Sequence, residues 1–316
     1  MPPKLETNNT LFNQHSYIPK NKSVMRMMRN FESKYNPVFS KVRTHWLPSI
    51  REFLREETGL KMHQKIHGVK IQKDSNISFE FVTDRENKFI QLIDMHYPEL
   101  DFDEYSAFNI LYSELKNSQK HFDGNSNNPR APYDELIAFF ENYFKKYDLN
   151  LLLNTLFKSS GRSADIWGTY TYKSGRIEVY YVPLILFCQI RNVPLEHAIL
   201  STLVHEMAHA YHHIGKDKDN VTWDKMSSTD LKIVEGMAEY FTWLFVETYK
   251  NNHPQMEKTY EIMFDCLGEE YTIFKKWTPA YSREAIKSAL LGTRKKALLK
   301  YVDFEMLLVN IQDLMH

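Results

Sequence analysis

The stretch of sequence that decides the fold is STLVHEMAHAYHHIGKD, residues 201–217. With the preceding PLEHAIL it places apolar residues at helical spacing. Pro194 suits the first position of a helix, and Gly215 suits the residue that follows the last turn. The pattern therefore predicts one long helix. Of the 13 histidines in the chain, four lie in the quoted stretch, so their spacing along the helix decides what they can do together.

Two of these histidines, His205 and His209, stand four residues apart, with Glu206 directly after the first. On a helix this spacing puts both imidazoles one turn apart on the same face, where they can reach one metal ion. Zinc prefers a tetrahedron of His nitrogens and carboxylate oxygens, with one position open to water where it is catalytic. Glu206 would project beside the metal and act on water. The only two cysteines, Cys188 and Cys266, argue against a thiolate site.

The segments on either side of this helix add a hairpin and a pair of carboxylates. IWGTYTY (166–172) and RIEVYYV (176–182) are rich in β-branched and aromatic residues, and the Lys-Ser-Gly between them predicts a hairpin. Downstream, LKIVEGMAEYFTWLFVETY predicts a second helix from about 229 to 250. Glu235 and Glu239 lie four residues apart on it and therefore share a face.

This order of elements, over about residues 165 to 250, resembles the zincin metallopeptidases. The metzincin subgroup is excluded, because it requires Gly three and His six residues after the second His, where this chain has His212 and Gly215. HEMAHA is also similar to a string in the SprT-like proteases, which use a third His that this chain lacks between His213 and His253. In zincins an edge strand pairs with the extended substrate, and the resemblance implies that RIEVYYV is that strand.

The closest pattern is that of the gluzincins, whose third zinc ligand is a Glu on the next helix, and VEGMAEYF fits it. The resemblance implies Zn2+ held by His205, His209 and Glu235, with Glu206 as the catalytic general base. It also implies that Glu239 accepts a hydrogen bond from a zinc-bound imidazole and fixes its tautomer. The exchanged assignment, with Glu239 as ligand and Glu235 as the supporting carboxylate, stays open.

The rest of the chain reads as mostly helical, with a strand-like ISFEFV at 77–82. The predicted fold class is α+β and predominantly helical. A small mixed sheet or hairpin precedes the active-site helix of a zincin-like core, and helical N- and C-terminal regions flank it. We divide the chain into a disordered tail at 1–20, a mainly helical domain at 21–122, a linker at 123–132 and a metallopeptidase domain at 133–316.

Charge is uneven along the chain although the formal net charge is zero. Residues 20–73 contain thirteen Lys or Arg against four Glu, a net charge of +9. Such a segment can contact nucleic acid. The alternative interpretation is a solvated helical face that pairs with acidic segments of the same chain, such as PELDFDE at 98–104.

The sequence thus predicts a zinc-dependent peptidase acting on peptides or proteins. One alternative is an SprT-like, DNA-associated protease that uses the basic segment 20–73, and another is a non-enzymatic interaction protein with structural zinc or none. We find no signal peptide or membrane-spanning run and expect a cytoplasmic protein without membrane contact. Tyr271, Tyr281 and His253 are candidate donors to the tetrahedral oxyanion, and spacing does not select among them.

Overall fold

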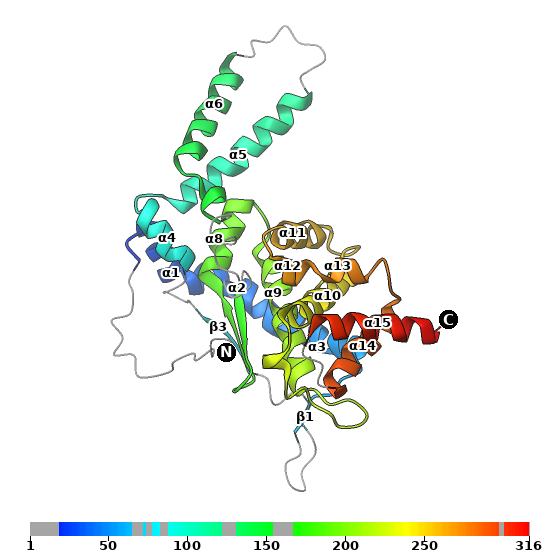
Figure 1. The fold of residues 1–316 in the computed structure, drawn as a ribbon. Helices are drawn as coiled ribbons and strands as arrows, with labels where there is room; N and C mark the ends of the chain where they lie inside the picture. The colour runs from blue at the N-terminus through cyan, green and yellow to red at the C-terminus, as the bar shows by residue number, and fades with distance from the viewer. Residues whose placement is uncertain are drawn as a thin grey trace.

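The fold is α+β and predominantly helical, as predicted, with one small mixed sheet beside the helical body (Figure 1). No described helix is both long and apolar enough to cross a membrane. The computed structural model describes residues 19–64, 72–73, 78–82, 88–121, 131–153, 167–296 and 300–315.

The described elements fall into an N-terminal series, which ends with a helical pair, and a C-terminal series that carries the predicted site. The first series contains α1 (Lys22–Arg29), α2 (Phe31–Lys41), a π-helical turn (Val42–Trp46), α3 (Leu47–Thr58), β1 (His63–Gln64), β2 (Gln72–Lys73), β3 (Ser78–Val82), α4 (Lys88–His96), α5 (Phe102–His121) and α6 (Ala131–Lys146). The second contains β4 (Gly168–Thr171), β5 (Arg176–Tyr180), α8 (Tyr181–Arg191), α9 (Leu195–Ile214), a 3-10 turn (Met226–Ser228), α10 (Leu231–Tyr249), α11 (Pro254–Phe264), α12 (Glu269–Thr272), α13 (Phe274–Trp277), α14 (Arg283–Lys296) and α15 (Tyr301–Met315).

The three-stranded sheet has the order β3–β5–β4, with β3 parallel and β4 antiparallel to β5. The strand predicted in ISFEFV is confirmed as β3, and the predicted hairpin as β4 and β5. β5, the strand within RIEVYYV, lies in the centre of the sheet with a neighbour on each side. The prediction that it is an edge strand open to substrate is therefore wrong, because β3 occupies its second side. In the described sheet, β4 pairs with β5 only, so the free edge of the hairpin is that of β4.

The long helix α9 runs through the middle of the body and is buried along almost its whole length. It packs against α3, α8, α10, α11 and the hairpin. Pro194 precedes its first turn, and the backbone N–H of Gly215 bonds to the Tyr211 carbonyl at its end. Helix α10 begins where the Asp230 side chain accepts a hydrogen bond from the N–H of Lys232, at 2.9 Å. Both predicted helices are thus present, and they lie side by side.

The stretches predicted as separate N-terminal and metallopeptidase domains share a sheet and a core. β3 pairs with β5 in a register that places Ser78 beside Arg176. One cluster of buried apolar side chains extends from Val24 on α1 to Leu308 on α15. Most of the predicted linker at 123–132, and nearly all of the predicted tail, lie outside the described residues.

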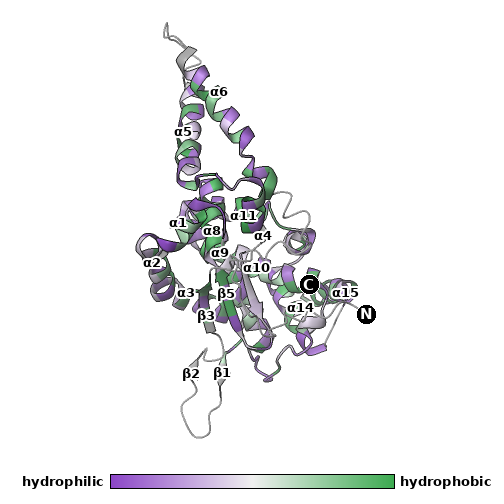
Figure 2. Ribbon diagram, turned by 90° about the vertical axis from the view of Figure 1, so that its left-hand side faces the viewer, coloured by the Kyte–Doolittle hydropathy of each residue, from purple (hydrophilic) through white to green (hydrophobic). Residues whose placement is uncertain are grey.

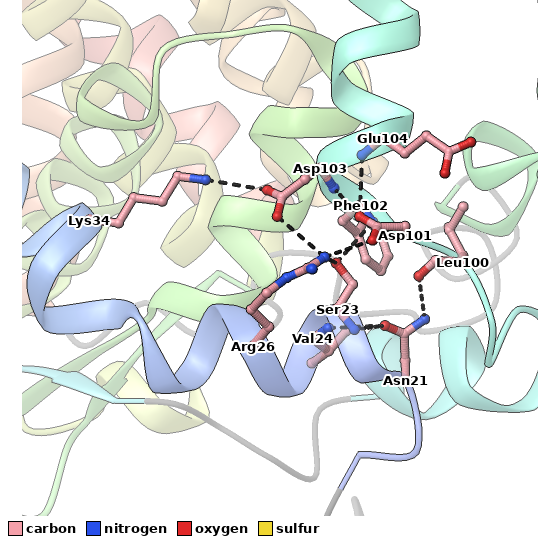
Figure 3. A network of polar contacts seen from close by, with 10 residues as sticks. All are labelled: Asn21, Ser23, Val24, Arg26, Lys34, Leu100, Asp101, Phe102, Asp103 and Glu104. Carbon is pink, nitrogen blue, oxygen red and sulfur yellow. Dashed lines mark hydrogen bonds and ion pairs between the residues drawn. The ribbon is translucent and has the colours of Figure 1, made fainter.

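Charges of the basic N-terminal segment pair with the acidic segment PELDFDE (Figure 3). The guanidinium of Arg26 lies 2.7 Å from a carboxylate oxygen of Asp101, and Nζ of Lys34 lies 3.3 Å from one of Asp103. The intramolecular interpretation of the basic segment is confirmed at these two positions. All four side chains are largely exposed, so each pair stabilises the fold by only about 1 kcal/mol or less.

The contact between α10 and the short helices after it depends on Gly236. A methyl group at this position would lie 2.5 Å from Cγ2 of Ile273 and 2.9 Å from the ring of Trp277, both of which are buried. The missing side chain therefore lets α12 and α13 close onto α10 directly beside Glu235.

We predict that Gly236→Ala destabilises the protein, although alanine favours helices over glycine by about 1 kcal/mol. Overpacking against two buried side chains costs about 1–3 kcal/mol and exceeds that gain. The matched control is Gly292→Ala on α14, where the nearest atom is the flexible end of Leu307. Urea unfolding should show a lower free energy of unfolding for the first variant only. Equal stabilisation of both would mean that α12 and α13 tolerate the methyl group.

Candidate metal centre

Two helices bring the predicted site residues together in the core. α9 carries His205, Glu206 and His209, and α10 carries Glu235 and Glu239. Both histidines are only 5% exposed, and the side chain of Glu235 is 15% exposed. Burying imidazole and carboxylate groups to this extent is costly unless they are paired or bind a metal.

Three of these residues direct one donor atom each at a common point. Nε2 of His205 and Nε2 of His209 lie 3.1 Å apart, and each lies 3.1–3.2 Å from Oε2 of Glu235. These three residues form a triad that could hold a metal ion. A tetrahedral zinc site with bonds of about 2.0–2.1 Å has donor atoms about 3.3 Å apart. The triangle in this structure is within about 0.2 Å of that size.

Glu239 contacts the other nitrogen of one ligand. Its Oε2 lies 2.9 Å from Nδ1 of His205, which leaves Nε2 of His205 directed at the triad. Glu239 is therefore placed as a support for His205, and Glu235 is the carboxylate that shares the common point. Nδ1 of His209 has no hydrogen-bond partner in the described part of the chain, so Glu239 supports one of the two histidines only.

The pKa values reflect the crowding of one carboxylate and two imidazoles. Burial opposes a charge on His205, but its hydrogen bonds to Glu235 and Glu239 outweigh burial and raise its pKa well above the ordinary value. Burial lowers the pKa of His209. Burial likewise opposes the charge of Glu235, yet the two imidazoles hold the pKa of its carboxyl far below the ordinary range. Positive charge between these groups therefore stabilises the site, whether it comes from a proton or from a metal ion.

Glu206 lies on the side of α9 that faces the hairpin and is 4% exposed. Gly168 of β4 lies close beside it, since a methyl group added there would lie 3.2 Å from Cγ of Glu206 and 2.8 Å from Cγ2 of Thr202. A narrow cavity of about 30 Å³ reaches Glu206 and His205 and is also lined by Trp167 of the hairpin. A cavity of this size has room for one or two water molecules.

The three candidate oxyanion donors lie in different places. The ring of Tyr271 on α12 lies 5.8 Å from the ring of His205. His253 instead packs against Trp46, with ring centroids 5.0 Å apart. Tyr281 follows α13, where its N–H bonds to the backbone carbonyl of Trp277. Among the described ring contacts of these three candidates, only that of Tyr271 reaches a residue of the triad.

Two further histidines, His212 and His213, lie on the last turn of α9. His212 is 1% exposed, and burial together with the Arg294 guanidinium lowers its pKa well below the ordinary value. Burial also lowers the pKa of His213, whose Nδ1 lies 2.9 Å from the Tyr170 hydroxyl. The positive charge at this helix end comes from Arg294, which donates to the carbonyl of Gly215. Sequence spacing cannot show this, because Arg294 arrives from α14.

No family model matches the chain, and neither a curated protein nor a solved structure matches it. The likeness to zincins consequently rests on the residues described above.

We predict that removing a donor atom of the triad abolishes metal binding, whereas removing Glu239 weakens it. His205→Ala and Glu235→Ala should retain no zinc after purification. Glu239→Ala should bind zinc about 10- to 100-fold more weakly, the usual effect of removing a carboxylate that supports a ligand imidazole. Elemental mass spectrometry and competition with a chromophoric chelator measure both quantities. His253→Ala, a histidine outside the triad, is the control and should keep its zinc; unchanged zinc in Glu235→Ala would transfer the ligand role to Glu239.

Proposed function

We propose that the protein is a zinc-dependent peptidase. The observation that carries the proposal is the triangle of donor atoms from His205, His209 and Glu235, with Glu206 adjacent to the first ligand on the same helix. Two imidazoles and one carboxylate are a donor set typical of catalytic zinc, which keeps a fourth position for water. When bound, zinc would lower the pKa of a water molecule towards neutrality and polarise the substrate carbonyl.

In this proposal Glu206 is the group that moves protons. It accepts a proton as water attacks the carbonyl carbon of the scissile peptide bond, and it delivers that proton to the leaving amine. Because Gly168 has no side chain, β4 can lie close beside the Glu206 side chain. Tyr271 is our candidate donor to the oxyanion, because it is the candidate ring beside His205.

The substrate is proposed to pair with the free edge of β4. The N–H of Tyr180 bonds to the carbonyl of Trp167 at 2.8 Å, and hydrogen-bonded positions alternate along an antiparallel pair. The backbone groups of Gly168 and Tyr170 therefore point away from β5, towards the free edge. An extended peptide that added to this edge would run beside Glu206, because Gly168 is both an edge residue and its neighbour.

The two alternative functions make different demands. A DNA-associated protease would need free positive charge on the basic segment, and two of its cations are already paired with Asp101 and Asp103. Salt-dependent DNA binding by the purified protein would support that function. A purely structural zinc site would need four protein ligands, and the described donors supply three.

We predict that Glu206→Gln keeps zinc but loses peptide hydrolysis. Gln preserves the size of the side chain and cannot accept the proton, so turnover should fall about 10²- to 10⁴-fold. The measurement is cleavage of a fluorogenic peptide library by the zinc-loaded wild type and variant, with zinc content determined on the same samples. Near-normal hydrolysis by the variant would remove Glu206 from the mechanism. Absence of hydrolysis by wild-type protein that holds one zinc per chain would favour the structural alternative.

We further predict that Gly168→Ala lowers turnover without loss of zinc. The added methyl group would overlap Cγ2 of Thr202 and press on Cγ of Glu206, so β4 must move away from α9. Thr202→Ser deletes the overlapping methyl group and should restore part of the activity when it is combined with Gly168→Ala. Steady-state kinetics of the two single variants and the double variant test this. Full activity of Gly168→Ala alone would show that the distance between β4 and Glu206 is unimportant.

A further inference from the structure

The arm formed by α5 and α6 extends away from the body that holds α9 and α10 (Figures 1 and 2). Its two helices meet along an aromatic seam in which Phe108 packs against Phe140 and Tyr143, with ring centroids 5.3 and 4.8 Å apart. Ile137 and Phe140 are 6% and 3% exposed and form the buried face of α6. The arm has only these two helices, so each has one side without a neighbour in the described structure.

Beside this seam, α6 carries apolar side chains that remain partly exposed. Leu136 and Phe139 are 42% and 52% exposed, and the half-buried Tyr143 follows at the next helical position of the same stripe. The stripe borders the seam, because one edge of Phe139 and of Tyr143 packs against Phe108, with ring centroids 5.8 and 4.8 Å apart. On α5, Ile110 and Leu111 are 42% and 47% exposed. Helices usually bury each apolar stripe against another layer, and contiguous exposed apolar residues mark interaction sites. Among the residues that the structure describes, no element covers this stripe of α6.

The charges beside this stripe indicate which partner fits. At 100° per residue, Glu135 and Lys146 lie on the same flank of the stripe, roughly 70° and 50° from its centre. They are near opposite ends of α6, and both are exposed. Neither belongs to an ion pair among the described residues, and Nζ of Lys146 lies 4.7 Å from the centre of the Tyr147 ring. In an antiparallel pair of identical helices, a flank of one helix faces the same flank of the other. Glu135 of one copy then lies opposite Lys146 of the second, and two-fold symmetry produces this pair twice.

We propose that the face of α6 formed by Leu136, Phe139 and Tyr143 binds the same face of a second copy of this chain, with the two α6 helices antiparallel. The two arms together would form a four-helix bundle, which supplies the layer that each arm lacks. Because the arm extends away from the body, the pairing leaves the metal centres of both copies outside the contact. A contact with an anionic lipid surface fits less well, since α6 also carries Asp134 and Glu141.

The first test is the mass of the full-length protein in solution, measured by sedimentation velocity between about 1 and 100 µM. The expected result is a concentration-dependent species of twice the chain mass of 37.6 kDa. Phe139→Glu should give monomers, because it puts two charges into the centre of the apolar contact. The matched control is Met306→Glu on α15, where an apolar side chain of similar exposure, 55%, is replaced by the same charge. The control should remain dimeric.

The second test uses the charge pair and does not disturb the apolar stripe. Glu135→Lys alone and Lys146→Glu alone each place like charges opposite one another twice, and each should weaken dimerisation about tenfold. An equimolar mixture of these two single variants should dimerise like the wild type, because each contact then joins a lysine of one copy to a glutamate of the other. This recovery depends on antiparallel pairing across the two-fold axis, and a merely destabilised arm would not show it.

Three outcomes would overturn the proposal. The wild type could remain a monomer at every concentration, or it could form a dimer that all three arm variants leave unchanged. It could also bind vesicles of neutral or anionic lipid through Phe139 while remaining monomeric, which would assign this face to a membrane surface. Circular dichroism melting of each variant confirms that a loss of the dimer does not reflect unfolding.

Discussion

The structure depends on keeping one carboxylate of α10 within 3.2 Å of two imidazoles of α9. Each of these groups is nearly buried, and leaving any of them uncompensated would cost several kcal/mol. α9 and α10 must therefore keep a fixed position relative to each other, both along their axes and in rotation about those axes. Two glycines allow the close packing that this arrangement requires. Gly168 lets β4 lie close beside Glu206, and Gly236 lets α12 and α13 pack onto α10. The site is thus a property of how these elements pack as well as of the motif.

The parts of the site that could be predicted from the sequence are those set by the geometry of single helices. Spacing by four residues is enough to place His205 with His209, and Glu235 with Glu239, on common faces. Whether the two faces meet depends on tertiary packing, and the expectation that they do came from the resemblance to gluzincins. The sequence left open which of the two carboxylates completes the triad, because Glu235 and Glu239 lie only one helical turn apart on the same face. Their distances from the two nitrogens of His205 distinguish them.

What the sequence could not show are contacts made by segments that arrive from far along the chain. β5 looked like an edge strand because its own hairpin contains only β4, whereas β3 joins its other side from almost 100 residues earlier. The surroundings of His212 and His213 at the end of α9 likewise depend on a distant segment. Burial, together with the guanidinium of Arg294 that reaches this end from α14, lowers the pKa of His212. Local periodicity predicts which residues form an element, and it carries little information about the neighbours of that element.

The N-terminal segment supplies none of the donor atoms of the triad, yet the geometry of the site extends into it through the sheet. β3 pairs with β5 along its full length, β5 pairs with β4, and Gly168 of β4 lies close beside Glu206. From the other side, α3 packs directly on α9. Arg26 and Lys34 form ion pairs with Asp101 and Asp103, and these pairs join the first helices of this segment to the start of α5. The position of Glu206 therefore depends in part on residues more than 100 positions before it, so the described elements between α1 and α5 act as part of the scaffold of the candidate metal centre.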